Sequence, residues 1–233
     1  MIKTIILAGG YGTRLGDVTD TIPKPMVEIG GIPIIVHIMN HYAHYGHNEF
    51  YIALGYKADY IKKYFDNFNS KWNIKLIDTG VDTQTGGRCK IISKEIGNER
   101  AFLTYGDGLS DININKLLDF HISNKKIITV SAVHPSARFG ELHLEGDRVI
   151  SFKEKPQLQS GWINGGFFVI EPEFYNFINK QDVMLEREPL EAAAMKSELY
   201  AFKHEGFWQC MDTRRDHHLL ETLWQSNDAP WKF

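Results

Sequence analysis

A short apolar run followed at once by glycines constrains this chain more than any other feature. Residues 2–7 are rich in isoleucine, and Gly9, Gly10 and Gly12 follow after a single alanine. A short β-branched run of this kind is typical of a buried strand in a parallel sheet. Because glycine lacks a Cβ, the loop after the strand can bring its backbone N–H groups close to an anion. The pattern therefore predicts an α/β sheet with an anion site after its first strand.

Two basic residues follow this loop. Arg14 carries a planar, permanently charged fork that suits phosphate. Lys24 stands between Pro23 and Pro25, whose restricted φ angles predict a rigid, extended backbone at the lysine. A strand, a glycine loop, an arginine and a rigidly placed lysine together predict a site for a polyphosphate.

The glycines by themselves are also compatible with a plain turn, because a glycine-rich loop after a first strand is often only that. No Gly-Lys-Ser/Thr follows the glycines, so the loop is not a P-loop. The G-x-G-x-x-G spacing of a dinucleotide-binding dehydrogenase is absent as well. Arg14 and Lys24 favour the phosphate site over the plain turn.

The longer pattern at 7–15, Leu-Ala-Gly-Gly-Tyr-Gly-Thr-Arg-Leu, resembles the signature of the sugar-1-phosphate nucleotidyltransferases, and Pro-Lys-Pro-Met at 23–26 extends it. These enzymes condense a nucleoside triphosphate with a sugar 1-phosphate. The resemblance implies that Lys24, Arg14 and Asp107 are catalytic. The nucleotide-binding residues that it implies are Leu7, Ala8, Gly9, Gly10, Gly12, Thr13, Arg14, Lys24, Thr83, Arg88 and Gly106.

The composition bounds the class of protein. With 233 residues, 43% of them hydrophobic and 24% charged, one large globular domain is expected. A net charge of −3 argues against a nucleic-acid or membrane surface. Cys89 and Cys210 make no disulfide framework, and no signal peptide or membrane span is recognisable. We therefore expect a cytoplasmic protein whose partners are small molecules.

Strand and helix signals alternate through the first half, which predicts a parallel sheet with helices on both faces. Strands are predicted at 50–54, 74–77, 101–105 and 127–133, and helices at 33–45, 58–68, 90–97 and 114–122. Later strands are predicted at 141–144, 148–152, 163–170 and 199–202, and helices at 171–178, 188–197 and 213–225. The expected fold is a Rossmann-like α/β fold, with a mostly parallel central sheet and a smaller antiparallel sugar-binding addition.

No linker rich in proline, glycine or serine separates two domains. We expect a single nucleotidyltransferase domain over 1–233. Its nucleotide-binding core would extend to about residue 135, and its sugar-binding part would cover about 136–212. A closing helix and tail would occupy 213–233.

Two aspartates are candidate metal ligands. Asp107 follows the strand predicted at 101–105, at the end of the sheet where open α/β folds bind ligands. An Asp-Gly turn is the alternative for Asp107, and a helix N-cap is the alternative for Asp212. The resemblance assigns both carboxylates to one Mg²⁺, which favours carboxylate and phosphate oxygens.

The resemblance also implies a sugar end in the second half of the chain. Lys155 would contact the sugar phosphate and Glu154 the sugar hydroxyls, although a Glu-Lys pair is commonly a solvated turn. Asn164 precedes two glycines that let a ligand approach, and its amide both donates and accepts hydrogen bonds. Gly140 belongs to the same end.

Residues 78–88, Asp-Thr-Gly-Val-Asp-Thr-Gln-Thr-Gly-Gly-Arg, resemble the nucleotide-binding segment of one branch, the glucose-1-phosphate cytidylyltransferases. Stretches at 26–31, 163–168, 207–209 and 229–232 also resemble this branch. The branch implies CTP, glucose 1-phosphate, a role in surface polysaccharide synthesis and a homo-oligomer. The segment at 64–78 is shorter than in typical members, in a region near subunit contacts and the nucleotide.

The implied reaction is in-line attack of the sugar-phosphate oxygen on the α-phosphorus of CTP, which expels pyrophosphate. Lys24 and Mg²⁺ would neutralise the α-phosphate, and Arg14 the leaving group. One alternative keeps the chemistry with UTP, or with another sugar 1-phosphate or phosphorylated metabolite. Another is a non-catalytic nucleotide-sensing subunit. The presence of Arg14, Lys24, Asp107 and Asp212 argues against it.

Overall fold

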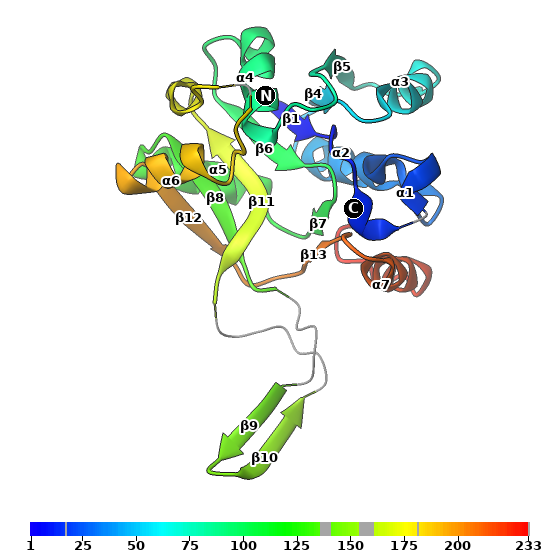
Figure 1. Ribbon diagram of the computed structural model, residues 1–233, viewed down its shortest axis with the longest axis vertical. Coiled ribbons are helices and arrows are strands. Elements are labelled where there is room, and N and C mark those ends of the chain that lie inside the picture. The colour runs from blue at the N-terminus through cyan, green and yellow to red at the C-terminus, as the bar shows by residue number, and fades with distance from the viewer. Residues whose placement is uncertain (17, 136–140, 154–160, 181, 233) are drawn as a thin grey trace.

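The computed structural model describes residues 1–16, 18–135, 141–153, 161–180 and 182–232. Its centre is a seven-stranded sheet with the strand order β12-β8-β11-β6-β1-β4-β5 (Figure 1). The strands are β1 (Lys3–Leu7), β4 (Glu49–Leu54), β5 (Asn73–Asp78), β6 (Ala101–Tyr105), β8 (Ile128–Val133), β11 (Ile163–Ile170) and β12 (Leu199–His204).

Most neighbours in this sheet are parallel. β1 pairs in parallel with β4 and β6, β4 with β5, and β8 with β12. β11 runs antiparallel to both of its neighbours, β6 and β8. The predicted mostly parallel α/β sheet is confirmed.

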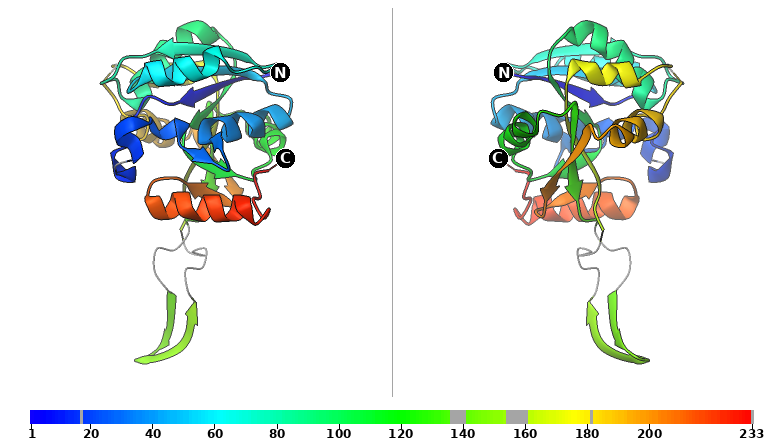
Figure 2. Two further views of the ribbon diagram at one scale, coloured as in Figure 1. Left: turned by 90° about the vertical axis from the view of Figure 1, so that its right-hand side faces the viewer. Right: turned by 90° about the vertical axis from the view of Figure 1, so that its left-hand side faces the viewer.

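Helices cover both faces of the sheet (Figure 2). Buried residues of α2 (Ile34–His44), α3 (Ala58–Asp66), α5 (Ile114–Asn124) and α7 (Arg214–Gln225) belong to one hydrophobic cluster. Those of α4 (Thr85–Ile96), α6 (Glu188–Met195) and the 3-10 helix η3 (Pro172–Phe177) belong to a second cluster. The short helix α1 (Val18–Thr21) precedes them all.

The first strand shows why the sheet is buried on both sides. Successive side chains of a strand point to opposite faces. Ile6 accordingly belongs to the cluster of α2, whereas Ile5 and Leu7 belong to the cluster of α4. A strand that is covered on both faces needs apolar residues at consecutive positions, as the N-terminal run provides.

Three small antiparallel pairs complete the fold. They are β2 (Glu28–Ile29) with β3 (Ile32–Pro33), β7 (Gly108–Ser110) with β13 (Trp208–Cys210), and β9 (Glu141–Glu145) with β10 (Arg148–Lys153). The β9–β10 hairpin extends away from the sheet (Figure 1). No helix in the described ranges is long and apolar enough to cross a membrane.

Two predicted helices differ from the observed ones. α4 begins at Thr85 rather than at residue 90, although two glycines in its first turn are poor helix formers. A tertiary contact explains the longer helix: the Gly86 N–H donates to the carbonyl of Val183 at 2.9 Å, and a Cβ on Gly86 would lie 2.7 Å from that oxygen. The predicted 171–178 helix is the 3-10 helix η3.

Candidate active site

A pocket of about 640 Å³ opens at the carboxyl ends of β1 and β6. Its size is in the range of small-molecule sites. The predicted site residues that line it are Leu7, Ala8, Gly9, Gly10, Gly12, Thr13, Lys24, Thr83, Arg88, Gly106, Asp107, Asn164 and Asp212. The fold therefore gathers residues from the N-terminus, the middle and the C-terminal part of the chain around one cavity.

Four predicted positions cannot be located in the same way. Gly140, Glu154 and Lys155 lie outside the described residues. Arg14 lies in the 3-10 helix η1 (Thr13–Leu15), directly after the glycine loop, and only its backbone is described. The roles proposed for these four residues stay predictions.

Close approaches of other residues require glycine at two positions around the pocket, Gly12 and Gly106. Gly12 has φ +69°, and a Cβ there would lie 2.9 Å from Cβ of Lys24. At Gly106 a Cβ would lie 3.0 Å from the carbonyl oxygen of Leu7, to which the Gly106 N–H donates at 3.1 Å. Gly10 is exposed and has open space where a Cβ would point. The loop thus packs tightly on one side and leaves room for a ligand on the other.

Lys24 begins a 3-10 helix, η2 (Lys24–Met26), so the extended course predicted for the backbone there is wrong. Pro23 is itself extended, and its carbonyl accepts the Met26 N–H at 2.8 Å. Pro25 occupies the first turn, where a helix does not need its missing N–H. The prolines still fix the lysine, which is 9% exposed.

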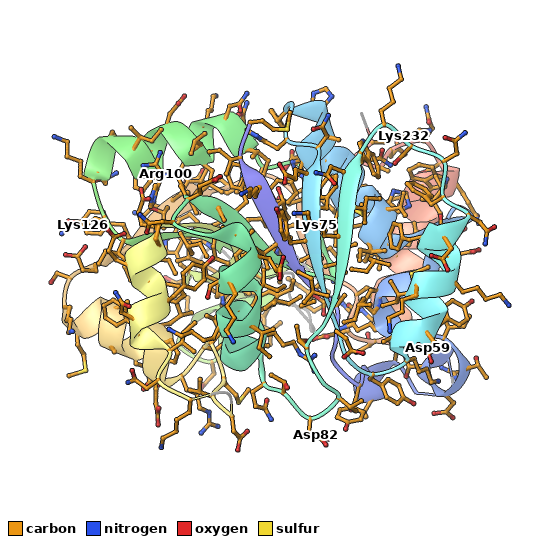
Figure 3. All side chains as sticks on the ribbon, turned by 90° about the horizontal axis from the view of Figure 1, so that it is seen from above. Asp59, Lys75, Asp82, Arg100, Lys126 and Lys232 are labelled. Atoms are coloured by element: carbon orange, nitrogen blue, oxygen red, sulfur yellow. The ribbon has the colours of Figure 1, made fainter. Side chains whose placement is uncertain are left out.

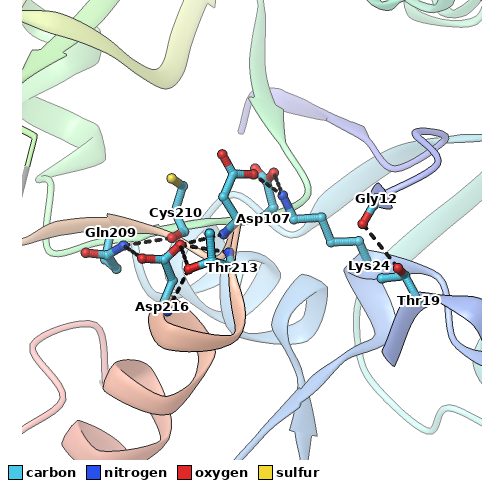
Figure 4. Close-up of polar contacts among 9 residues, drawn as sticks. Gly12, Thr19, Lys24, Asp107, Gln209, Cys210, Thr213 and Asp216 are labelled. Atoms are coloured by element: carbon cyan, nitrogen blue, oxygen red, sulfur yellow. Dashed lines mark hydrogen bonds and ion pairs between the residues drawn. The ribbon is translucent and has the colours of Figure 1, made fainter. Parts of the chain in front are cut away.

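The ammonium of Lys24 lies between two carboxylates (Figure 4). Its Nζ is 2.6 Å from Oδ2 of Asp107 and 2.5 Å from Oδ1 of Asp212. The two aspartates meet because β13 pairs with β7, and the Met211 N–H donates to the carbonyl of Asp107 at 2.8 Å. Two residues far apart in sequence thereby face one cation.

Asp212 is not the N-cap of α7, because its neighbour Thr213 occupies that position. Thr213 caps α7, and it forms a capping box with Asp216. The Asp212 N–H donates to the Asp216 carboxylate at 3.1 Å. The side chain of Asp212 is therefore not needed for the cap and contacts Lys24 instead.

The electrostatics of this cluster keep the lysine charged. Burial lowers the pKa of Lys24, but Asp107 and Asp212 outweigh burial and raise it above the ordinary value. Burial and then the same two carboxylates raise the pKa of the Cys210 thiol to about 12. Cys210 lines the pocket but is a neutral thiol there, which argues against a thiolate nucleophile.

The two carboxylates fit a divalent cation. Both already converge on one positive charge, which shows that their oxygens can approach a common point. No group of three His, Cys, Asp or Glu ligands occurs within the part of the chain that the structure describes. A metal held here would take its remaining ligands from substrate phosphates and water, as Mg²⁺ commonly does.

Arg88 is buried in the wall of the pocket, with 3% exposure. Its Nη1 donates to the carbonyls of Leu54 and Gly80 and to the hydroxyl of Thr79, at 2.9, 2.8 and 2.6 Å. Its Nη2 donates to the carbonyls of Gly9 and Val81, both at 3.0 Å. The guanidinium therefore joins the end of β4 to the loops that follow β1 and β5. Direct contact of Arg88 with a nucleotide stays a prediction.

One contact spans the rim of the pocket. The Tyr11 hydroxyl of the glycine loop donates to the Asp82 carboxylate at 2.7 Å, and the Tyr11 ring lies 5.0 Å from that of Tyr56. Seen from above, Asp82 lies at the tip of the loop between β5 and α4 (Figure 3). The two loops that line this side of the pocket thus touch each other.

Several residues that line the pocket were not predicted from the sequence, among them Tyr105, Thr85, Glu186 and Trp208. Trp208 lies in β13 and donates from Nε1 to the carbonyl of Gly165 at 2.7 Å. Thr85 and Tyr105 lie beside predicted site residues, so their sequence positions could have suggested them. Glu186 lies between η3 and α6, and no motif in that part of the sequence indicates a pocket residue.

Residues 3–213 match the sequence profile of the nucleotidyl transferases. The chain belongs to the nucleotidyl transferase family. Members of this family generally use a divalent metal ion, in agreement with the convergence of Asp107 and Asp212.

Three curated relatives show how far this similarity extends along the chain. A glucose-1-phosphate cytidylyltransferase from Salmonella typhi is 44% identical, over 99% of this chain and 99% of its own. A probable glucose-1-phosphate cytidylyltransferase from Bacillus subtilis is 38% identical over the same shares. A mannose-1-phosphate guanyltransferase from Aspergillus oryzae is 29% identical, over 92% of this chain and 62% of its own.

Solved structures agree on the fold. HddC from Yersinia pseudotuberculosis, complexed with GMP-PN, superposes with a TM-score of 0.76 and 25% identity, over 96% of this chain and all of its own. A UDP-glucose pyrophosphorylase complexed with UDP-glucose superposes with a TM-score of 0.77 over 97% of this chain and all of its own, although only 17% of residues are identical.

Proposed function

We propose that this protein condenses CTP with α-D-glucose 1-phosphate to give CDP-glucose and pyrophosphate. The observation that carries the proposal is the Lys24–Asp107–Asp212 cluster, in a chain 44% identical over its full length to a Salmonella cytidylyltransferase. This cluster provides the opposite charges that phosphoryl chemistry needs, an exchangeable cation and a pair of oxygen ligands.

The chain's own residues suffice to position the reactants. The attacking oxygen belongs to a phosphate that is already ionised, so no strong general base is required. Lys24 would transfer its hydrogen bonds from the aspartates to the α-phosphate and stabilise the charge that develops there. Mg²⁺ held by Asp107 and Asp212 would add a second positive charge at the same phosphate.

The other roles are assigned on the same basis. Arg14 and the amides of residues 9–13 would hold the leaving pyrophosphate, because they follow β1 at the pocket. Asn164 would contact the sugar, together with Gly140, Glu154 and Lys155. We also propose that the protein is a cytoplasmic homo-oligomer whose product enters surface polysaccharide synthesis.

The test is pyrophosphate release with Mg²⁺ and glucose 1-phosphate, measured separately with CTP, UTP, dTTP, ATP and GTP. We expect release with CTP. GTP is an informative competitor, because the HddC structure holds a guanine nucleotide analogue. Release with another nucleotide alone would contradict the choice of CTP. Binding of CTP without release would redirect the search to another sugar 1-phosphate or phosphorylated metabolite.

A further inference from the structure

Glu186 lines the pocket with a carboxylate that the proposed mechanism does not use. It comes from the segment between η3 and α6, which is distant in sequence from the glycine loop and from the aspartates. The side chain is half-buried. No basic side chain forms an ion pair with it within the described ranges.

Two hydroxyl donors fix this carboxylate. The Tyr105 hydroxyl donates to Oε1 at 2.6 Å, and the Thr85 hydroxyl donates to Oε2 at 2.8 Å. Each oxygen of an ionised carboxylate has two acceptor positions, so each retains one for a further donor. The orientation of the group is therefore set before any ligand arrives.

The two hydroxyl groups are themselves oriented by hydrogen bonds that they accept from other residues. The Thr85 hydroxyl accepts the Leu185 N–H at 2.8 Å, and the Tyr105 hydroxyl accepts the Asn164 side-chain amide at 3.2 Å. The side-chain oxygen Oδ1 of Asn164 in turn accepts the Gly166 N–H at 2.8 Å. Burial first, and then the Glu186 carboxylate, raise the pKa of Tyr105 well above its usual value, so the phenol keeps its proton.

The negative charge of Glu186 restricts which groups of a ligand can lie next to it. A carboxylate repels the phosphates that a site with Lys24 attracts, and like charges brought together are costly in a binding site. It favours neutral hydroxyl donors, and carboxylate acceptors form the stronger class of hydrogen bond. Both proposed substrates contain a sugar ring whose secondary hydroxyls are neutral donors of this kind.

We propose that Glu186, held by Tyr105 and Thr85, accepts a hydrogen bond from a secondary sugar hydroxyl of a substrate. The inference rests on the proposed function for the identity of the substrates. Thr85 follows the predicted nucleotide residue Thr83, whereas Asn164 belongs to the predicted sugar end. The hydroxyl therefore belongs either to the ribose of the nucleotide or to the sugar of the sugar 1-phosphate.

The experiment compares wild type with Glu186→Gln, and uses Glu188→Gln as the matched control. Glu188 is exposed, lies in the same segment and does not line this pocket. Affinities are measured by calorimetry for CTP, its 2′-deoxy and 3′-deoxy forms, glucose 1-phosphate and its monodeoxy analogues. We expect one deletion of a hydroxyl to weaken wild-type binding about tenfold or more. In Glu186→Gln, removal of the same hydroxyl should reduce affinity several-fold less than in wild type. Removal of any other hydroxyl should reduce affinity by the same factor in both proteins.

The ligand that shows this loss of discrimination identifies the source of the hydroxyl as ribose or sugar. Equal penalties for every deletion in wild type and Glu186→Gln would overturn the proposal. If Glu186→Gln does not fold, Glu186→Asp keeps the charge but withdraws it by one methylene, and it should weaken the same contact. Pyrophosphate release by wild type tests the proposed function separately, because the binding comparison needs no turnover.

Discussion

Two buried cations in the same pocket are stabilised in opposite ways. Lys24 is neutralised by the carboxylates of Asp107 and Asp212. The guanidinium of Arg88 is surrounded by neutral acceptors, four carbonyls and one hydroxyl. Burial lowers the pKa of Arg88 as its largest effect, but a guanidinium remains charged at any ordinary pH.

From this difference we propose that Lys24 is a reactive cation and Arg88 a structural one. An ammonium between two carboxylates can exchange them for a phosphate, because the carboxylates can then take a metal ion in its place. A guanidinium whose hydrogen bonds go mostly to backbone carbonyls has no such exchange available, since releasing it would break five hydrogen bonds that join the end of β4 to the loops after β1 and β5. We therefore expect substitutions at Lys24 to affect catalysis most, and substitutions at Arg88 to affect stability most.

The largest expected effect is on turnover in Lys24→Met. Loss of the ammonium removes charge stabilisation at the α-phosphate, so kcat should fall about 10²–10³-fold or more. Steady-state pyrophosphate release measures the change. Lys57→Met serves as the control, because Lys57 bonds the carbonyls of Thr19 and Asp20 and does not line the pocket. A kcat near the wild-type value in Lys24→Met would remove Lys24 from the mechanism.

The next effect is on stability in Arg88→Met and Arg88→Lys. Methionine removes the five hydrogen bonds that the guanidinium makes, and each contributes about 0.5–1.5 kcal/mol, so the free energy of unfolding should fall by about 2–4 kcal/mol. Lysine, with three donors in place of five, should recover part of the loss. Urea denaturation followed by circular dichroism measures both. An unchanged midpoint in Arg88→Met would show that Arg88 is not structural.

Gly9→Ala should lower the free energy of unfolding as the Arg88 variants do, because the added methyl group displaces the Arg88 side chain. A Cβ at Gly9 would lie 2.2 Å from Nη1 of Arg88 and 2.3 Å from its Cζ, so the guanidinium must move. Strain of this kind costs about 1–3 kcal/mol of stability. Gly10→Ala is the matched control for the melting temperature, because nothing lies within 4 Å of its Cβ position. Equal melting temperatures for the two variants would contradict the close packing of Arg88 on Gly9.

Added Mg²⁺ should show, without any turnover, that the metal site depends on the carboxylates beside Lys24 and not on Arg88. Binding to the folded protein stabilises it by about 1–3 kcal/mol at concentrations well above the dissociation constant. Wild type and Arg88→Lys should both show the rise in melting temperature, whereas Asp212→Asn should lose it. A rise that survives in Asp212→Asn would mean that the metal binds elsewhere.

The smallest effect concerns pH. The pKa of Lys24 is raised in the folded protein, so the stability that its charge contributes is fully present below the unfolded value of 10.5 and is lost only as the pH rises through the folded pKa. The difference in unfolding free energy between wild type and Lys24→Met should therefore stay constant from about pH 8 to 10 and change only above this range. Denaturation series over that interval measure it. A difference that already changes near pH 8 would show that the carboxylates do not outweigh burial.

The fold was largely predictable because its strands are strongly patterned. The strands at 101–105 and 163–170 were predicted with their observed bounds, since each contains a run of apolar residues and ends directly before a glycine or a charged residue. The pairs β7–β13 and β2–β3 escaped prediction, because two- and three-residue strands carry no periodic signal. α4 was predicted too short because a contact with Val183, invisible in the local sequence, supports its glycines.

The candidate site was predictable where a motif concentrates several residues, as around Gly9 and Lys24. Two kinds of information were missing. The sequence predicted Arg88 as a site residue but not the direction of its guanidinium, which depends on where the end of β4 and two loops lie in the fold. It did not name Glu186 at all, because a lone glutamate in an irregular segment acquires its meaning only from Tyr105 and Thr85.

The pairing of β7 with β13 also has a consequence during synthesis, because it joins an early segment of the chain to a late one. A chain emerging from a ribosome presents the glycine loop, Lys24 and Asp107 long before β13 and Asp212 exist. Until then only one of the two carboxylates that pair with the lysine has been synthesised. Contacts between such distant segments form slowly. The newly made N-terminal part therefore carries the glycine loop without the second oxygen ligand, and the cation site can be completed only after residue 212 has been synthesised.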